Sequence, residues 1–296
     1  MDQPSLNESA SPADAAPASN PEENTNPVLP FFPAALAREY GLDEADEEHP
    51  PFVVVTRTAL EFCHWLRHAT PAVQWLQVED LLDEPEAWAT AARKEGDVAL
   101  DVIMSDPAAE FSHLYRLVDV RNVRDVRVTI PVAPGFLKAL RLAASIQLPV
   151  RLLPGQPGPE QIEELLEAVD FYLHDPMVQA PIEWFHSTIA SLNGVPVEDM
   201  WMILEQDPNE FPKLDDTGTP TLPAHQPGPV PENIVDAHTA SLPDHNPDDP
   251  WEKLCRGYFQ YPDPQYDGTG IKKVFEALKA GADEMNAALA TREPTA

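Results

Sequence analysis

Short runs of β-branched and apolar residues alternate with longer amphipathic runs through the middle of this chain. The first clear example is FVVVT at residues 52–56, followed by a run with apolar residues at helical spacing and with Thr58 and Glu61 at capping-box positions. Such alternation is typical of βα units, in which parallel strands are joined by helices that return across the sheet. This pattern therefore predicts an α/β fold with a parallel sheet.

Six strand–helix pairs can be placed in this region. The strands are expected at residues 52–56, 73–78, 98–104, 126–132, 150–153 and 171–173, and the helices at 58–68, 84–95, 108–117, 136–146, 160–168 and 182–192. Six parallel units suit a curved, partly closed barrel, whose functional face lies at the carboxyl ends of its strands. We therefore predict a partial (βα)6 barrel over residues 52–205.

The flanking segments differ in composition from this region. Residues 1–51 contain eleven acidic residues and one basic residue, Arg38, and we expect a disordered acidic tail in which 29–40 can form a short helix or a docking segment. Residues 206–250 contain ten prolines and are expected to form an extended linker. A second compact segment is predicted at 251–290.

The charge balance restricts the classes of partner. Nineteen basic residues against fifty acidic ones leave a net charge of −31, which argues against nucleic acid and anionic lipid as partners. No apolar run approaches the roughly 18 residues that indicate a membrane-spanning helix. The N-terminus lacks the basic and apolar regions of a signal peptide, and the two cysteines fit a reducing compartment. These features predict a cytoplasmic protein without a membrane partner.

The sequence FVVVTRTALEFCHWLRH at residues 52–68 resembles the start of a radical SAM enzyme. In that family, a first strand ending in Thr-Arg is followed by C-x3-C-x2-C, and the three thiolates hold a [4Fe–4S] cluster whose open iron binds S-adenosylmethionine. The matching positions here are Ala59, Cys63 and Leu66, so only one of the three thiolates is present. Because one thiolate cannot replace three, we expect the cluster to have been lost.

The turn after the second predicted strand also departs from the family. Intact members are expected to carry a glycine-rich turn there, which binds the amino group of S-adenosylmethionine, whereas this chain has VEDLLDEP at residues 78–85. Without glycine the main chain loses the close approach that the turn permits. Glu79 and Asp80 are left as the groups that could reach an amine, and we expect S-adenosylmethionine binding to have been lost too.

A second resemblance lies near the C-terminus. Residues 251–270, WEKLCRGYFQYPDPQYDGTG, look like the end of a SPASM extension, which binds auxiliary clusters in peptide-modifying radical SAM enzymes. Cys255 stands at the C-x-G-Y-F position, but Tyr266-Asp267-Gly268 occupies the place where a further cysteine is expected. The resemblance implies a SPASM-like segment at 251–290 that has lost its auxiliary cluster.

Together the two resemblances suggest a degenerate radical SAM/SPASM protein, similar to the peptide maturases. We expect a non-catalytic accessory or binding protein without cofactor. Its partners would be a peptide substrate or an active radical SAM maturase, and the acidic surface would favour a basic segment in the ligand.

Other interpretations remain open from the residues. His174 and Asp175 follow the sixth predicted strand and could form the acid–base pair of a barrel-type hydrolase or lyase, although Asp before Pro is also a common helix cap. His64 and His68 have the i, i+4 spacing of metal ligands, but the apolar stripe turns the adjacent Cys63 away from them, so no metal site is predicted. A purely structural acidic interaction protein is the third alternative.

Overall fold

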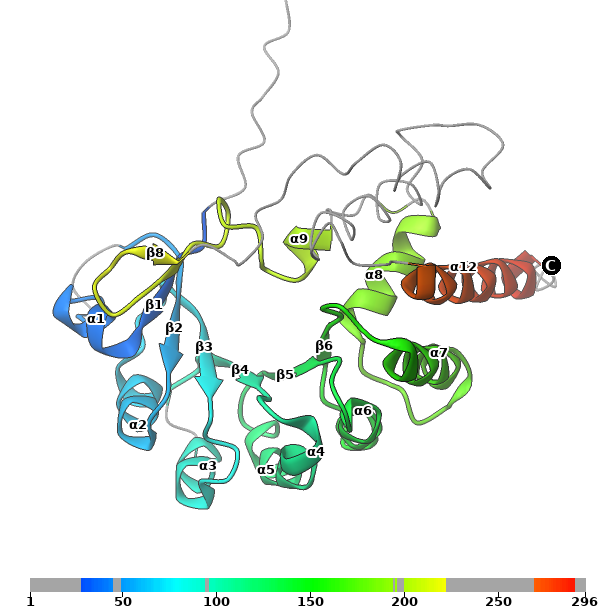
Figure 1. Cartoon of the computed structure of the whole chain (residues 1–296). Coiled ribbons are helices and arrows are strands. Elements are labelled where there is room, and N and C mark those ends of the chain that lie inside the picture. Colours follow the sequence, from blue (N-terminus) through cyan, green and yellow to red (C-terminus); the bar gives the residue numbers. More distant parts are fainter. Residues whose placement is uncertain are drawn as a thin grey trace, which may run out of the picture.

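The computed structural model describes residues 28–44, 49–93, 96–193, 195, 200–221 and 269–290 (Figure 1). Its centre is one sheet with the strand order β6-β5-β4-β3-β2-β1-β7-β8. The strands are β1 (Phe31–Pro33), β2 (Phe52–Thr56), β3 (Val73–Glu79), β4 (Ala99–Ile103), β5 (Val126–Pro131), β6 (Val150–Leu153), β7 (Lys213–Leu214) and β8 (Pro220–Thr221). Strands β1 to β7 pair in parallel, and β8 is antiparallel to β7. The prediction of an α/β fold with a mostly parallel sheet is confirmed.

Helices connect the parallel strands and cover one side of the sheet. They are α1 (Ala34–Glu39), α2 (Ala59–His68), α3 (Pro85–Ala91), α4 (Pro107–Glu110), the 3-10 helix η1 (Phe111–Arg116), α5 (Leu117–Val120), α6 (Phe136–Ser145) and α7 (Pro159–His174). Three more helices follow, namely α8 (Glu183–Leu192), α9 (Met200–Ile203) and α12 (Thr269–Ala290). Figure 1 shows the curved sheet with α2 to α7 along its convex side; β8 lies at one edge of the sheet, and α8 and α12 lie beyond the other.

The main core lies between the sheet and these helices. Alternate strand residues such as Leu76, Leu100 and Val128 are fully buried there, against helix residues such as Phe62 and Trp88. Two helices begin at the capping residues expected from the sequence. Thr58 forms a complete capping box with Glu61 at the start of α2, and Asp106 caps α4. Within the part of the chain that the structure describes, no helix is both long enough and apolar enough to cross a bilayer.

Two predictions at the ends of the sheet were wrong. Residues 171–173, predicted as the sixth strand, lie inside helix α7, because Ile162, Leu165 and Val169 continue a buried helical stripe toward them. The sheet instead begins earlier, with β1 inside the segment predicted as a disordered tail, where it is followed by the short helix α1. The chain thus has six consecutive parallel strands, but they are shifted by one unit toward the N-terminus.

Candidate functional site

The concave side of the sheet, opposite helices α2 to α7, is here called the inner face. Because side chains alternate along a strand, the residues between the core positions point to this side. In β1 and β2 they are apolar, and Phe31, Val53 and Val55 form a small cluster with neighbouring apolar residues, including Trp75 of β3. In β4 to β6 they include the buried polar or charged residues Asp101, Arg127, Thr129 and Arg151. The inner face is therefore apolar at one end and charged at the other.

Five charged residues form a cluster on the inner face, here called the buried charge cluster. They are Asp101 of β4, Arg127 of β5, Arg151 of β6, Glu183 of α8 and Glu205 after α9. Arg127 Nη2 donates to Asp101 Oδ2 at 2.9 Å and to both oxygens of Glu205 at 2.9 and 3.0 Å. Arg151 Nε donates to Glu183 Oε2 at 3.2 Å. Strands β4, β5 and β6 are thereby tied to the two segments that follow them in the chain.

The cluster holds Asp101 and Arg127 in their charged forms. Burial alone would raise the pKa of Asp101, but Arg151, Arg127 and the hydroxyl of Thr129 lower it below the usual value for a carboxyl group. Burial would lower the pKa of Arg127, but Asp101 and the two glutamates raise it above its ordinary value. Asp101 therefore stays ionised at neutral pH and is unsuited to general acid–base catalysis, which needs a pKa near the working pH.

Trp75 covers the cluster on its apolar side. The guanidinium carbon of Arg127 lies 4.1 Å from the centre of the Trp75 ring, which is a cation–π contact. Among the described residues, Arg127 Nε has no hydrogen-bond partner, and Arg151 Nη2 lies 2.5 Å from Glu205 Oε1 without hydrogen-bond geometry. Glu205 itself has a positive φ of 51°, a strained conformation for this residue type that the two arginines help to hold.

The carboxyl ends of β2, β3 and β4 bring together a second polar group, here called the rim. Arg57 Nε contacts Glu79 Oε2 at 2.8 Å, and Gln77 Nε2 donates to Glu79 Oε1 at 2.6 Å. Ser105 Oγ donates to Asp80 Oδ1 at 2.6 Å, and Asp80 has a positive φ of 56°. Glu79 and Asp80, the two sequence candidates for contact with an amine, therefore lie next to each other at the carboxyl end of β3, with hydrogen-bond partners in place.

Lys213 is a site residue that the sequence did not indicate. It lies on β7, and its Nζ is 5.5 Å from the centre of the Phe31 ring on the inner face. Desolvation by the surrounding walls lowers the pKa of Lys213, although Glu79, Glu205 and Asp101 act in the opposite direction. The residue is still exposed, and it forms no ion pair with the residues that the structure describes. Its ammonium group is therefore available to a ligand on the inner face.

The remnant cluster positions lie on a helix. Ala59 is the first residue of α2, Cys63 is half-buried in its middle, and Leu66 is buried in the core on the convex side. A helix rises about 1.5 Å per residue, so positions 59 and 66 are roughly 10 Å apart along its axis. Three thiolates must close around the irons of one cluster together, and this arrangement does not fit that requirement. Cys255 lies outside the described residues.

His174 and Asp175 do not form the predicted pair. The helix that replaces the sixth strand places them at the end of α7 instead of at a strand end, which corrects that part of the prediction. His174 Nε2 contacts Asp170 Oδ1 at 3.6 Å, while Asp175 Oδ1 accepts a hydrogen bond from the Met177 main-chain N–H at 2.8 Å. Asp175 therefore forms a turn after α7, and the alternative interpretation, in which it caps the start of a helix, is wrong as well.

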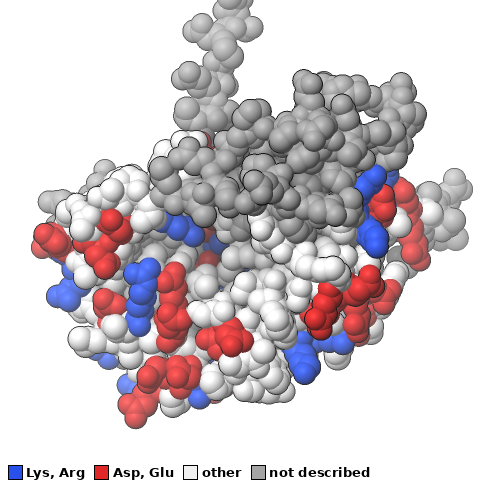
Figure 2. All heavy atoms as spheres, viewed as in Figure 1, with Lys and Arg blue, Asp and Glu red and all other residues white. Residues whose placement is uncertain are grey.

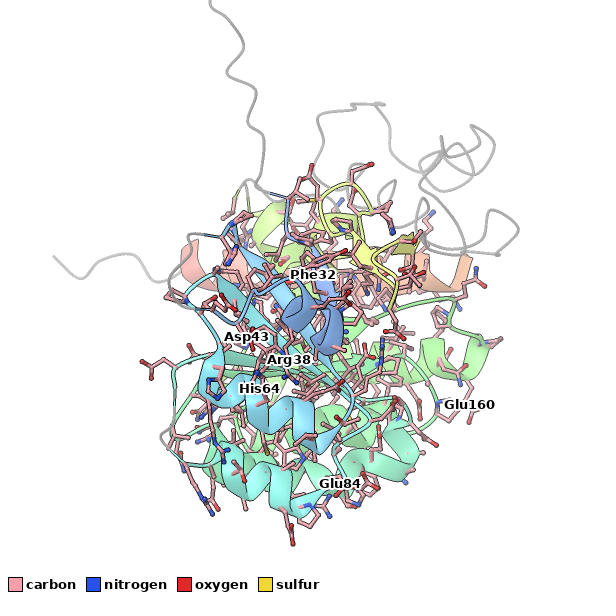
Figure 3. All side chains as sticks on the ribbon, turned by 90° about the vertical axis from the view of Figure 1, so that its left-hand side faces the viewer. Phe32, Arg38, Asp43, His64, Glu84 and Glu160 are labelled. Atoms are coloured by element: carbon pink, nitrogen blue, oxygen red, sulfur yellow. The ribbon has the colours of Figure 1, made fainter. Side chains whose placement is uncertain are left out.

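The two histidines of α2 make contacts of a different kind. His64 Nε2 lies 2.8 Å from Asp43 Oδ2, and the His64 ring stacks on His68 with centroids 4.6 Å apart. Figure 3 shows Arg38, Asp43 and His64 gathered beside α1, away from Glu84 and Glu160. Among the described residues, no group of three or more His, Cys, Asp or Glu is arranged to hold a metal ion. The histidines instead link α2 to the loop after α1.

Comparisons with known proteins add no family to this picture. Searches against family models, curated proteins and solved structures found no match to this chain.

Proposed function

We propose that this chain is a degenerate radical SAM/SPASM protein that binds a peptide on the inner face of its sheet and performs no radical chemistry. The assignment to this family, and the choice of a peptide as ligand, rest on the sequence resemblance at residues 52–68 and 251–270. Six parallel strands that pair in chain order and curve around one face are compatible with the partial barrel of that family (Figure 1).

The observation that carries the proposal is the state of the charged residues on the inner face. The arginines and carboxylates of the buried charge cluster are paired with one another, and Asp101 is kept ionised. A carboxylate fixed as Asp101 is shapes and stabilises the surface, but it does not transfer protons at neutral pH. The helical placement of Ala59, Cys63 and Leu66 argues in the same direction, because a cluster would need a different main-chain path.

The inner face offers two features that suit an extended peptide. The apolar side chains of Phe31 and Val55 supply a surface for hydrophobic side chains. Lys213, which forms no ion pair within the described part of the chain, supplies a donor for main-chain carbonyl oxygens beside them. A peptide can therefore lie across the apolar end of the face with its carbonyl groups toward β7.

The charge of the rim favours a basic segment in that peptide. Glu79 and Asp80 lie at the carboxyl end of β3, and Asp106 and Glu110 follow β4 on the next βα connection. Over the whole chain the net charge is −31, and Figure 2 shows acidic side chains outnumbering the basic ones with which they are interspersed on the visible described surface. Long-range attraction of this sign speeds the encounter with a cationic ligand and weakens as salt is added.

A displayed library of random peptides, selected against the full chain, tests the proposal. We expect enrichment of sequences that combine basic and apolar residues, with binding reduced in the rim variant Glu79→Gln/Asp80→Asn. The matched control is Glu163→Gln/Glu167→Gln, which removes two exposed charges from the outer helix α7. Loss of binding in both variants, or in neither, would contradict a site on the rim. If the selected peptide also binds an active radical SAM maturase, the ligand belongs to a peptide-modification system.

A further inference from the structure

A cavity of about 450 Å³ opens at the amino-terminal ends of β5 and β6, away from the rim. It shares Trp75, Arg127 and Glu183 with the inner face, and its other walls come from the segment after α5 and the loop before β6. This volume lies in the range of small-molecule sites, which combine apolar walls with a few polar groups. Neither the peptide proposal nor the rim makes use of it.

Three arginines line this cavity. Arg124 and Arg127 are each only 7% exposed, so two buried cationic side chains form its inner wall. Arg124 is held in place by main-chain carbonyls, because its Nε donates to Ala91 O at 3.0 Å and its Nη2 donates to Arg93 O at 3.1 Å. This wall is preformed, so a ligand does not have to order it.

Arg121 is the arginine with donors to spare. Its Nη2 donates to Gln147 Oε1 at 3.2 Å, and its Nη1 donates to Ile146 O, so two of the five N–H groups of the guanidinium are directed to neutral oxygens. Among the described residues, no carboxylate forms an ion pair with Arg121. The adjacent amide of Asn122 also lines the cavity and adds neutral donors.

Two carboxylates at the cavity limit the charge that it can accept. Glu183 is already engaged by Arg151 at 3.2 Å and by Arg127 at 3.5 Å, and Asp125 is exposed at the cavity wall. A doubly charged phosphate would lie close to both carboxylates and be repelled by them. A ligand carboxylate carries one negative charge, and its geometry matches the planar fork of one guanidinium.

We propose that this cavity binds the carboxylate of a small ligand, such as an amino acid derivative or the C-terminus of a peptide. Arg121 is the primary contact, the Asn122 amide supports it, and Trp75 provides an apolar wall for the remainder of the ligand. The chain has 19 basic and 50 acidic residues, so most of its surface attracts cations. A cavity lined by three arginines is suited to an anion instead.

Calorimetric titration of the full chain with N-acetylphenylalanine and with its C-terminal amide tests this proposal, because the two probes differ only in the carboxylate. We expect the acid to bind and the amide to bind at least about ten-fold more weakly, as the loss of a charge-assisted pair requires. Arg121→Gln should weaken binding of the acid by a similar factor. Arg141→Gln, a matched change on the outer surface of α6, should leave it unchanged.

Equal binding of acid and amide, or no binding of the acid at millimolar concentration, would overturn the proposal. The comparison of the two probes uses the unaltered chain, so it remains decisive even if Arg121→Gln fails to fold. Inorganic phosphate in a third titration should bind more weakly than the acid, and tighter binding of phosphate would also contradict the assignment. Peptide binding at the rim is tested by separate variants, so either proposal can fail alone.

Discussion

Asp101 and Arg127 are direct neighbours across β4 and β5, and their side chains meet on the inner face with Nη2 and Oδ2 2.9 Å apart. Both residues are more than nine-tenths buried. The ion pair therefore depends on its partners to offset the desolvation of its charges, and it fixes the charged end of the inner face.

Removal of one charge from this pair should strongly destabilise the fold. Asp101→Asn leaves Arg127 and Arg151 buried with one carboxylate fewer, and we expect the free energy of unfolding to fall by about 3–5 kcal/mol. Chemical denaturation measures this loss. The control Asp170→Asn, on an exposed part of α7, should change stability by less than about 0.5 kcal/mol. A loss below about 1 kcal/mol for Asp101→Asn would mean that the cluster does not stabilise the sheet.

The same carboxylate predicts a dependence of stability on acid. The pKa of Asp101 is lowered in the folded chain from an ordinary value of 3.8, so its contribution is present above that value and is lost as pH falls through the folded pKa. Stability curves measured from neutral pH downward should therefore fall less steeply below pH 3.8 for Asp101→Asn than for the unaltered chain. Parallel curves for the two proteins would contradict this assignment.

Lys213 should react with amine-directed acylating reagents at lower pH than an ordinary exposed lysine, because its lowered pKa leaves more of the neutral amine. Mass spectrometry of the labelled chain gives the rate at each pH, with the exposed Lys138 of α6 as the internal reference. Since Glu79 raises the pKa of Lys213, Glu79→Gln should increase the labelling rate further. Slower labelling of Lys213 than of Lys138 at every pH would be inconsistent with an open inner face.

Restoration of the missing cysteines should not restore a cluster. In Ala59→Cys/Leu66→Cys the three thiols are spread along one helix, and the one at position 66 is directed into the core. After anaerobic reconstitution with iron and sulfide, iron content and optical absorption should remain below one cluster per chain, in both the variant and the unaltered protein. A stoichiometric [4Fe–4S] absorption band in either protein would show that α2 rearranges around a cluster.

The central strands could be predicted from sequence because short runs of β-branched and other apolar residues mark them, and β2 and β6 begin and end where the pattern indicates. Strand β1 was missed because only three residues, Phe31 to Pro33, carry its signal within a proline-rich and acidic context. Residues 171–173 were misassigned because Phe and Tyr favour strands locally, while the longer amphipathic stripe of α7 decides their conformation.

The candidate site was less accessible to sequence reasoning. Asp101, Arg127 and Arg151 each look like the solvent-facing residue of an alternating strand, and only the curvature of the sheet and the approach of Glu183 and Glu205 bury them. Lys213 reaches the inner face from a strand far away in the chain, within a segment predicted as a linker. The one feature of the sequence that could have drawn attention to Lys213 is the scarcity of lysine, of which the chain has seven.

Peptide binding on the inner face can be measured as the dissociation constant of a selected basic peptide for the metal-free chain, by fluorescence anisotropy at two salt concentrations. We expect saturable binding without iron or S-adenosylmethionine, weakened about ten-fold by Glu79→Gln/Asp80→Asn and by added salt, and unchanged by Glu163→Gln/Glu167→Gln. Binding that requires a reconstituted cluster, or that is insensitive to the rim variant, would contradict this expectation.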